Sequence, residues 1–497
     1  MVFIFLLSVI FAIRSESNDD SQIKVTILHT TDMHGWINGH LHEPELDADL
    51  GDLYNYIYWK KSRKDPNEIV LAFDTGDYTQ GTGLSDATPV QGEFIFEQVK
   101  RIPYDGLCIG NHELRSNGCI DNIANNVAPF WRGKYLALNA RHVDSSKQLG
   151  GKYFTIDLPN NVGKALVFGF LVSSCTHDTK SVLLTVSQSL KDPMFNQAFS
   201  TPNVSLIICL CHIDTPNPDV ELIRKFMKSH KPNIPVVMLT GHSHLTRIET
   251  PTPDDYVMES GFYSNVIGNL QFHLSKSASK GRYFEPLVEM VDYTQSWVDM
   301  SKEALQQSAG FNSSSGWDTP MGSSIKAAIH KKVAELNLTR QIGCSPKHFS
   351  MFPKGFFFSS LYDFVLDTAF PKMFKKQQLD YVFSLPNLVF RYDLYKGPIV
   401  EDDLYAVDPF NYGLGVFPSV SAAHLKKVAS LLGSTVFSSN LKKLADDEKV
   451  NFVFTTNEAA NVQSKFEQVA PGQYKWNAVG TSVRTLFRDY VISNLKC

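Results

Sequence analysis

The sequence lacks a strong net charge of either sign. Its 497 residues include 47 lysines and arginines against 51 aspartates and glutamates, which leaves a formal net charge of −4. A nucleic-acid-binding protein usually carries a basic excess, so we expect no nucleic-acid partner. Hydrophobic residues make up 43% of the chain and aromatic residues 12%. These fractions are those of a folded protein and exclude a mainly disordered one.

Long hydrophobic runs are missing too, except at the start of the chain. Residues 1–13 read MVFIFLLSVIFAI, which has the length of a signal-peptide core and is too short to span a bilayer comfortably. Ser15-Glu16-Ser17 follows with a small-x-small cleavage pattern, although no lysine or arginine precedes the run. We therefore expect a signal peptide at residues 1–17. We expect no membrane anchor, because the end of the chain, Ser493 to Cys497, lacks a hydrophobic tail.

Cysteine is scarce, with 7 residues in the chain. An odd number leaves at least one thiol free, or paired with another chain, if the others form disulfides. Cys108, Cys209 and Cys211 lie in apolar runs, which favours packed thiols. N-x-S/T sequons occur at Asn203, Asn312 and Asn337. Sequons fit a glycoprotein on the secretory route, so we expect the protein outside the cell or in the lumen of a vacuole-like or lysosome-like organelle.

The first half of the chain has the pattern of an α/β protein. Up to about residue 270, a short apolar run is repeatedly followed by a polar cluster and then by a more helical stretch. Continuous apolar runs are typical of strands covered on both faces, which favours a layered α/β architecture. The runs are Val25–Leu28, Ile69–Phe73, Leu107–Ile109, Leu136–Leu138, Ala165–Leu171, Val204–Cys211 and Val236–Leu239.

A second unit is expected after residue 338, because the chain is too long for one ordinary core. Residues 308–322 are typical of an exposed loop, and Ser323 to Leu336 has the apolar spacing of a connecting helix. Beyond it we expect strands at Tyr381–Phe383 and Asn451–Thr455 and helices at Phe358–Ala369 and Thr481–Asn494. The expected divisions are a domain over residues 22–307, a linker with the connecting helix over 308–338, and a domain over 339–497.

Side chains that bind metals follow five of the expected strands. They are Asp32-Met33-His34, Asp77, Asn111-His112-Glu113, His212 and His242-Ser243-His244. Each motif alone is also typical of a turn or cap, but the carboxyl ends of strands in an α/β sheet are where sites form, so these groups can converge. Imidazoles with carboxylates suit Zn, Mn, Fe or Co, and two such ions sharing a carboxylate serve phosphoester hydrolysis best.

The series resembles the motif set of the calcineurin-like metallophosphoesterases. The motifs that carry the resemblance are Asp32-x-His34, Gly76-Asp77, Gly110-Asn111-His112-Glu113, His212 and Gly241-His242-x-His244. Ile27–Gly35 and Gly76–Thr82 are similar to the secreted 5′-nucleotidase branch, and Gln341–Gly343 and Gly397–Phe410 resemble parts of its second domain. The resemblance implies an N-terminal four-layer α/β/β/α metallophosphoesterase domain and a C-terminal α/β substrate-binding domain.

The resemblance also implies a role for each motif residue. One divalent ion would be held by Asp32, His34, Asp77 and His244, and the other by Asp77, Asn111, His212 and His242. Asp77 would bridge the ions, and a hydroxide between them would attack the phosphorus. His112 would stay off the metals and stabilise the transition state or protonate the leaving oxygen. Glu113 is interpreted as a turn or helix-start carboxylate near the amides that follow it.

The implied function is a secreted, dinuclear-metal phosphoester hydrolase that releases phosphate from nucleotides. Other phosphomonoesters, cyclic phosphodiesters and sugar-nucleotide diphosphates are alternative substrates within this class. A different class, a non-catalytic protein that keeps the metals and binds nucleotides or phosphoesters, is the main alternative. That alternative draws its support from the positions at which the chain departs from the 5′-nucleotidase pattern.

The first departure is Arg115, which stands where the family has an aspartate three residues after the catalytic histidine. It can be a surface residue, can bind phosphate oxygens, or can mark a weakened site. Arg391 keeps an arginine of the family's Asn-x-Gly-Gly-x-Arg segment, but Leu388 and Val389 replace its glycines, which argues against a close backbone approach to a ligand. Phe410 can stack on a base or belong to the core. The candidate substrate-binding residues are Asn111, Arg115, Arg391 and Phe410.

Overall fold

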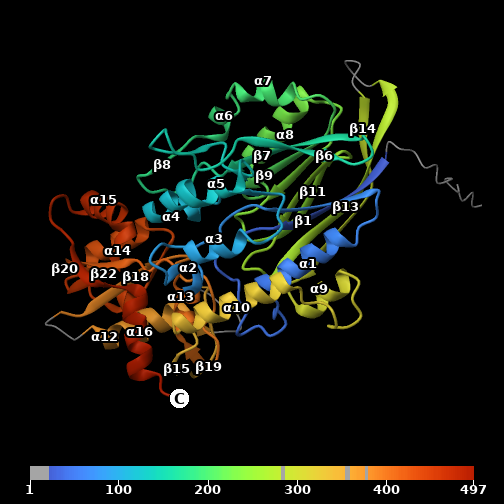
Figure 1. The fold of residues 1–497 in the computed structure, drawn as a ribbon. Coiled ribbons are helices and arrows are strands. Elements are labelled where there is room, and N and C mark those ends of the chain that lie inside the picture. Colours follow the sequence, from blue (N-terminus) through green and yellow to red (C-terminus); the bar gives the residue numbers. More distant parts are fainter. Residues whose placement is uncertain (1–21, 281–285, 353–358, 375–378) are drawn as a thin grey trace, which may run out of the picture.

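The computed structural model describes residues 22–280, 286–352, 359–374 and 379–497, which form two bodies (Figure 1). The signal peptide expected at residues 1–17 lies outside the described residues. One hydrophobic core extends over the sequence from Ile23 to Leu338. Two further cores are built from residues between Phe349 and Val491. Both bodies have the expected α/β class.

Two six-stranded sheets form the centre of the first body. Their strand orders are β14-β13-β1-β2-β3-β4 and β11-β12-β10-β9-β7-β6. The strands of the first sheet are β1 (Gln22–Thr30), β2 (Glu68–Asp74), β3 (Gly106–Cys108), β4 (Tyr135–Leu136), β13 (Val266–Lys280) and β14 (Pro286–Asp299). Those of the second are β6 (Tyr153–Leu158), β7 (Gly163–Leu171), β9 (Val204–His212), β10 (Val236–Thr240), β11 (Thr246–Thr252) and β12 (Asp255–Ser260).

Each of the seven apolar runs expected to be strands overlaps a strand in the parallel parts of the two sheets, although β4 includes only Leu136 of the run Leu136–Leu138. The long strands β13 and β14 were not expected. In β13 the buried Leu270, Phe272 and Leu274 alternate with the more exposed Gln271 and His273. A strand with one open face gives this mixed pattern rather than a continuous apolar run.

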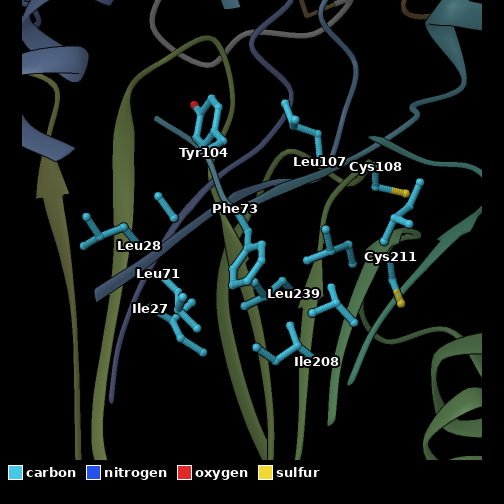
Figure 2. Packing of buried hydrophobic residues seen from close by; sticks show 14 of the residues in the cluster. Ile27, Leu28, Leu71, Phe73, Tyr104, Leu107, Cys108, Ile208, Cys211 and Leu239 are labelled. Atoms are coloured by element: carbon cyan, nitrogen blue, oxygen red, sulfur yellow. The ribbon is translucent and has the colours of Figure 1, made fainter. Parts of the chain in front are cut away.

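The two sheets share one hydrophobic core (Figure 2). Ile27 and Phe73 from the first sheet and Ile208 and Leu239 from the second are each fully buried in it. The apolar faces of both sheets are thereby removed from water, which is the main stabilising contribution to a layered fold. Cysteines contribute as small hydrophobes: Cys108, Cys209 and Cys211 are buried free thiols, as expected.

Helices cover the outer faces of the two sheets and complete the four layers (Figure 1). Helix α1 (Leu50–Ser62) contacts β2, and α8 (Pro218–His230) contacts β10. The shorter helices of the first body are α2 (Gly83–Asp86), α3 (Glu93–Val99), α4 (Asn117–Asn122), α5 (Ala128–Trp131), α6 (Val186–Ser189), α7 (Met194–Phe199) and α9 (Lys302–Ser308). Strands β5 (Ala140–His142) and β8 (Ser181–Leu183) form a separate antiparallel pair.

The connecting helix, α10 (Pro320–Glu335), starts earlier than the sequence pattern indicated. The Thr319 side chain accepts a hydrogen bond from the Gly322 amide, and Pro320 occupies the first helical turn, so the helix begins three residues before Ser323. Ile325 and Ile329 are fully buried in the core of the first body, where α10 packs along α1. The expected linker helix is therefore part of the first body's packing.

The second body is a five-stranded sheet between two layers of helices. The strand order is β21-β18-β22-β20-β23, with β18 (Tyr381–Pro386), β20 (Gly413–Ser421), β21 (Thr435–Phe437), β22 (Lys449–Thr455) and β23 (Asn477–Ser482). Along β22, Phe452 and Phe454 pack into one core while Val453 packs into the other, as the two-residue period of a strand requires. Each face of the sheet therefore has its own core.

One core contains α14 (Ala422–Leu431) and α15 (Ala459–Val469), and the other contains α11 (Leu361–Phe364), a π-helical turn at Val365–Ala369, α12 (Phe370–Met373) and α16 (Val483–Asn494). The helix expected from Phe358 begins at Leu361, because Ser360 caps it by accepting a hydrogen bond from the Asp363 amide. The helix expected from Thr481 begins at Val483, since Thr481 belongs to β23. The remaining strands and α-helix are β15 (Gln341–Ser345), β16 (Phe349–Ser350), β17 (Ser359–Ser360), β19 (Gly397–Val400) and α13 (Glu401–Val407).

The two bodies meet beside the carboxyl ends of the strands of the first body. Trp36 and Tyr263 from the first body and Tyr392 and Ala406 from the second form a small buried cluster. Polar contacts surround it: the Gly83 amide donates to Asp402 (2.6 Å), for example. This interface places the segment around Arg391 and Phe410 next to the candidate metal-binding residues.

Candidate metal centre

The candidate metal-binding side chains come from separate strand ends and lie together in the structure. Asp32 and His34 follow β1, Asp77 follows β2, Asn111 follows β3, His212 ends β9, and His242 and His244 follow β10. His34 Nε2 is 3.5 Å from Asp77 Oδ2, and His212 Nε2 is 3.1 Å from the same oxygen. These side chains therefore converge in space, as their positions at the strand ends predicted.

The side chains divide into two sets. Asp32, His34 and His244 place ligand atoms within 4.8 Å of one another, and so do Asp77, His212 and His242. Asn111 adjoins the second set, with Oδ1 3.1 Å from His212 Nε2. Because Asp77 Oδ2 also reaches His34, the Asp77 carboxylate lies between the two sets.

His112 also approaches this group, since His34, Asp77 and His112 form a third set with ligand atoms within 4.8 Å. Its Nε2 is 3.7 Å from Asp77 Oδ2, and its ring meets the His34 ring edge-on. The Nδ1 of His112 lies 2.5 Å from Gln80 Oε1. An amide oxygen only accepts hydrogen bonds, so Nδ1 carries a proton and Nε2 faces the metal-binding side chains.

The backbone is strained at the residues that carry these side chains. Positive φ angles occur at Asp32 (51°), His34 (47°), Asp77 (60°), His242 (84°) and His244 (60°). L-residues rarely adopt this conformation, which costs on the order of 1–3 kcal/mol each and is concentrated at functional sites. Five such residues around one point support a functional rather than a structural cluster.

Backbone carbonyls orient the imidazoles. The Nδ1–H of His34 donates to the Thr79 carbonyl (2.8 Å), and that of His212 donates to the Thr75 carbonyl (2.8 Å). A carbonyl can only accept, so Nδ1 of each ring carries a proton and Nε2 is the nitrogen that points into the cluster. This outer contact is the usual support of a metal-binding histidine.

The charges of the cluster suit divalent cations. Burial opposes ionisation of Asp32 and Asp77, but the surrounding imidazoles outweigh it and hold the pKa of both carboxyls well below the usual value. Burial lowers the pKa of His244 to about 4 and also lowers that of His242, so both rings are neutral at neutral pH. Despite burial, Asp77 and Asp32 raise the pKa of His212 to about 10. A bound cation would take the place of that proton.

The Oδ1 atom of Asp32 is buried without a hydrogen-bond donor, and its surroundings indicate where a cation fits. Asp32 Oδ1 is inaccessible to solvent and accepts no hydrogen bond. Imidazole nitrogens lie around it, with His244 Nε2 at 3.3 Å and His34 Nε2 at 3.8 Å. A buried, ionised oxygen without a donor is costly, and a cation between it and the imidazoles removes that cost. The residues present therefore fit a pair of divalent metal ions.

Glu113 has a different role from the expected one. Its fully buried carboxylate accepts hydrogen bonds from the amides of Gly110 (2.8 Å), Asp77 (2.9 Å), Tyr78 (2.8 Å) and Thr79 (3.3 Å). The expectation that it serves the amides that follow it is wrong, because the donors come from the preceding turn and from the loop after β2. Glu113 therefore joins the two loops that carry Asp77 and Asn111.

Arg115 is half-buried and lies beside the cluster. Its guanidinium carbon is 5.6 Å from the centre of the Phe410 ring, and its Nε is buried without a hydrogen-bond partner. Arg391 approaches the same ring at 5.7 Å, and its Nη2 is 3.3 Å from His244 Nε2. Phe410 stacks in parallel on Tyr412 at 5.3 Å. Arg115, Arg391 and Phe410, three of the residues considered for substrate binding, therefore lie together beside the candidate metal-binding side chains.

Two residues at the site were not expected from the sequence. Gln80, which holds His112, has a φ of 64° in the loop after β2, so a polar residue in a short loop next to Asp77 was the available signal. Tyr263 packs edge-on against His34 and accepts a hydrogen bond from Arg391 Nε (3.3 Å). It follows β12, which runs parallel to β10, so its chain position placed it at the same edge.

A double sheet with paired Asp and His sets at its strand ends defines a metal-dependent phosphoester hydrolase. Residues 25–246 match the family model described as calcineurin-like phosphoesterase, and residues 358–479 match the NAD nucleotidase C-terminal domain. The chain therefore combines a calcineurin-like phosphoesterase domain with a domain of the NAD nucleotidase C-terminal type, which fits the two-domain resemblance found in the sequence.

Two relatives and one solved structure are similar to this chain over most of its length. An uncharacterized protein of Schizosaccharomyces pombe is 28% identical over 453 residues, covering 84% of this chain and 74% of the relative. A protein of Arthroderma benhamiae named "Secreted protein" is 25% identical, covering 91% of this chain and 74% of the relative. The crystal structure of a 5′-nucleotidase from Candida albicans has the same fold, with a TM-score of 0.82 at 20% identity over 94% of this chain and 98% of that one.

Proposed function

We propose that the protein releases phosphate from nucleotides by hydrolysis at a dinuclear metal site, and that it does so in the secretory pathway or outside the cell. The observation that carries the proposal is the Asp77 carboxylate, which lies between two sets of Asp and His ligands. One shared carboxylate between two ligand sets is the arrangement that positions two ions for phosphoryl transfer.

We propose a role for each residue of the cluster. Asp32, His34, Asp77 and His244 would hold one ion, and Asp77, Asn111, His212 and His242 the other. When bound, the ions polarise the phosphoryl group and lower the pKa of water. His112, whose Nε2 faces the cluster, would stabilise the charge of the transition state or donate a proton to the leaving oxygen. Gln80 keeps the ring in place, and Arg391 would contact the phosphate.

The two bodies divide this work in our proposal. Residues 22–307 would form the catalytic domain, residues 308–338 the connection, and residues 339–497 the domain that selects the substrate. The support is the position of Arg391 and Phe410, which belong to the second body and lie next to His244 and His112 of the first. A substrate bound at the metals would therefore contact both bodies.

The test is phosphate release by the purified protein, supplied with manganese or zinc, from nucleoside mono-, di- and triphosphates, sugar nucleotides and an aryl phosphate. We expect release that a chelator abolishes, with nucleotides preferred over the aryl phosphate. His112→Ala is expected to lower kcat about a hundredfold or more, because one proton-transferring or charge-stabilising group is lost. A protein that binds two metals and a nucleotide but releases no phosphate would instead be the non-catalytic binding protein.

Secretion is proposed from three observations. A relative is named "Secreted protein". The sequon residues Asn203, Asn312 and Asn337 are all exposed and accessible to glycosylation. Cys344 and Cys497 form a disulfide that links β15 to the end of the chain, and disulfides are typical of oxidising compartments.

Peptide mapping of the secreted protein under non-reducing conditions tests this proposal. We expect an N-terminus at residue 18 and a linked Cys344–Cys497 peptide. Because the disulfide closes a segment of 153 residues, Cys344→Ser with Cys497→Ser is expected to destabilise the second body by about 2–4 kcal/mol, measured by thermal unfolding. Cys175→Ser, at a free thiol, is the matched control. Recovery of all seven cysteines as free thiols would contradict the expectation.

A further inference from the structure

Two guanidinium groups, those of Arg115 and Arg391, lie beside the candidate metal-binding side chains. Among the described residues, neither Arg115 nor Arg391 forms an ion pair with a carboxylate, and the buried Nε of Arg115 has no partner at all. Two other partly buried arginines do contact carboxylates: Arg224 contacts Asp255, and Arg488 contacts Glu401. An unpaired cation and an unsatisfied donor inside a protein are both costly, so the pair indicates a site for an anion.

The two arginines approach one ring from different parts of the site. Their guanidinium carbons lie 5.6 Å and 5.7 Å from the centre of Phe410. Arg391 is next to His244, a candidate metal ligand, where the phosphoryl group to be cleaved would bind. Arg115 follows His112 in the same turn, and the His112 ring is 6.0 Å from Phe410. Since His112 would face the leaving oxygen, Arg115 borders the leaving-group side.

We propose that Arg115 is a specificity-determining residue that binds a second phosphoryl group on the leaving-group side of the substrate. The substrate class is then a phosphoric anhydride, such as a nucleoside diphosphate, rather than a nucleoside monophosphate. A guanidinium binds a phosphoryl group through two parallel hydrogen bonds, which gives both affinity and orientation. This inference rests on the proposed hydrolytic function and names its substrate.

The charge of the site favours the same substrate. The aspartate that Arg115 replaces in the 5′-nucleotidase pattern would repel a second phosphoryl group, whereas a guanidinium attracts it. In the reaction, water adds to the terminal phosphorus and the bond from that phosphorus to the bridging oxygen breaks. The bridging oxygen leaves with the nucleoside monophosphate, so ADP and water give AMP and inorganic phosphate without any further reactant.

The kinetic test compares ADP with AMP as substrates of the wild-type protein and of Arg115→Ala. We expect Arg115→Ala to lower kcat/KM for ADP about ten- to a hundredfold, the size of a lost charged hydrogen bond, and to leave AMP within about threefold. Arg115→Asp is expected to reduce the preference for ADP further. Arg141→Ala removes an exposed arginine on β5 and is the matched control. Equal losses for ADP and AMP, or no loss for either, would overturn the proposal.

A binding test separates this inference from the proposed function. Imidodiphosphate, which has two phosphoryl groups but a P–N–P link, and inorganic phosphate are titrated into the metal-loaded protein by calorimetry. Arg115→Ala should weaken imidodiphosphate about ten- to a hundredfold and leave phosphate nearly unchanged. If the wild-type protein released no phosphate from any substrate, the proposed function would fail, yet this titration would still decide whether Arg115 binds the second phosphoryl group. Equal affinities of the wild-type protein and Arg115→Ala for imidodiphosphate would show that it does not.

Discussion

Asp77→Asn is expected to remove at least one bound metal ion and to lower phosphate release about a thousandfold or more. The carboxylate lies between the two ligand sets, with Oδ2 3.1 Å from His212 Nε2 and 3.5 Å from His34 Nε2. An amide at this position offers one neutral oxygen and a nitrogen that repels cations. The negative charge that both ions would share is thereby lost.

The fold should tolerate this substitution. A loss of metal and activity would then result from the lost carboxylate charge and not from unfolding. Asp77 Oδ1 accepts a hydrogen bond from the His112 amide (2.8 Å), and an asparagine oxygen can accept the same bond. Metal content after dialysis, measured by mass spectrometry, and the midpoint of thermal unfolding are recorded together with activity. Asp157→Asn, at an exposed carboxylate of β6, is the control. Two retained metal ions with full activity in Asp77→Asn would rule out Asp77 as the bridging ligand.

Glu113→Ala is expected to destabilise the first body by about 3–5 kcal/mol and to weaken metal binding about ten- to a hundredfold. The substitution leaves four buried amide groups, at residues 77, 78, 79 and 110, without an acceptor. Each unsatisfied buried donor costs about 1–3 kcal/mol before the loops relax. The loops then lose the geometry that holds Asp77 and Asn111.

Glu113→Gln keeps the size of the side chain and changes only its hydrogen-bonding groups. It therefore separates the effect of lost hydrogen bonds from the effect of lost volume. The amide oxygen can replace one carboxylate oxygen, but the amide nitrogen would face two N–H groups, so we expect a smaller loss of both stability and metal affinity. Thermal unfolding and equilibrium metal titration measure the two effects. Glu97→Ala changes an exposed carboxylate of α3 and should shift stability by less than about 0.5 kcal/mol. An unchanged metal affinity in Glu113→Ala would mean that the loops keep their positions without this carboxylate.

Many strands of the first body were predictable from the sequence, because each depends on the pattern of neighbouring residues along the chain. A strand covered on both faces must be apolar throughout, so β7, β9 and β10 stand out as continuous runs. Strand β13 was missed because its buried and more exposed residues alternate, and β14 was missed because residues 292–296 are all exposed. Helix starts were misplaced by about three residues at α10, where the capping residue Thr319 decides the boundary.

Chain order alone identified the residue types of the metal-binding cluster and the strand ends that carry them, because metal chemistry requires imidazoles and carboxylates and parallel strands end at a common edge. Contacts between distant segments were decided only by the tertiary structure. It placed Asp77 between two ligand sets, made Glu113 the acceptor for amides of another loop, and brought Arg115 and Arg391 to the same ring. Such contacts depend on how two sheets and two bodies pack, and packing joins residues that no local pattern relates.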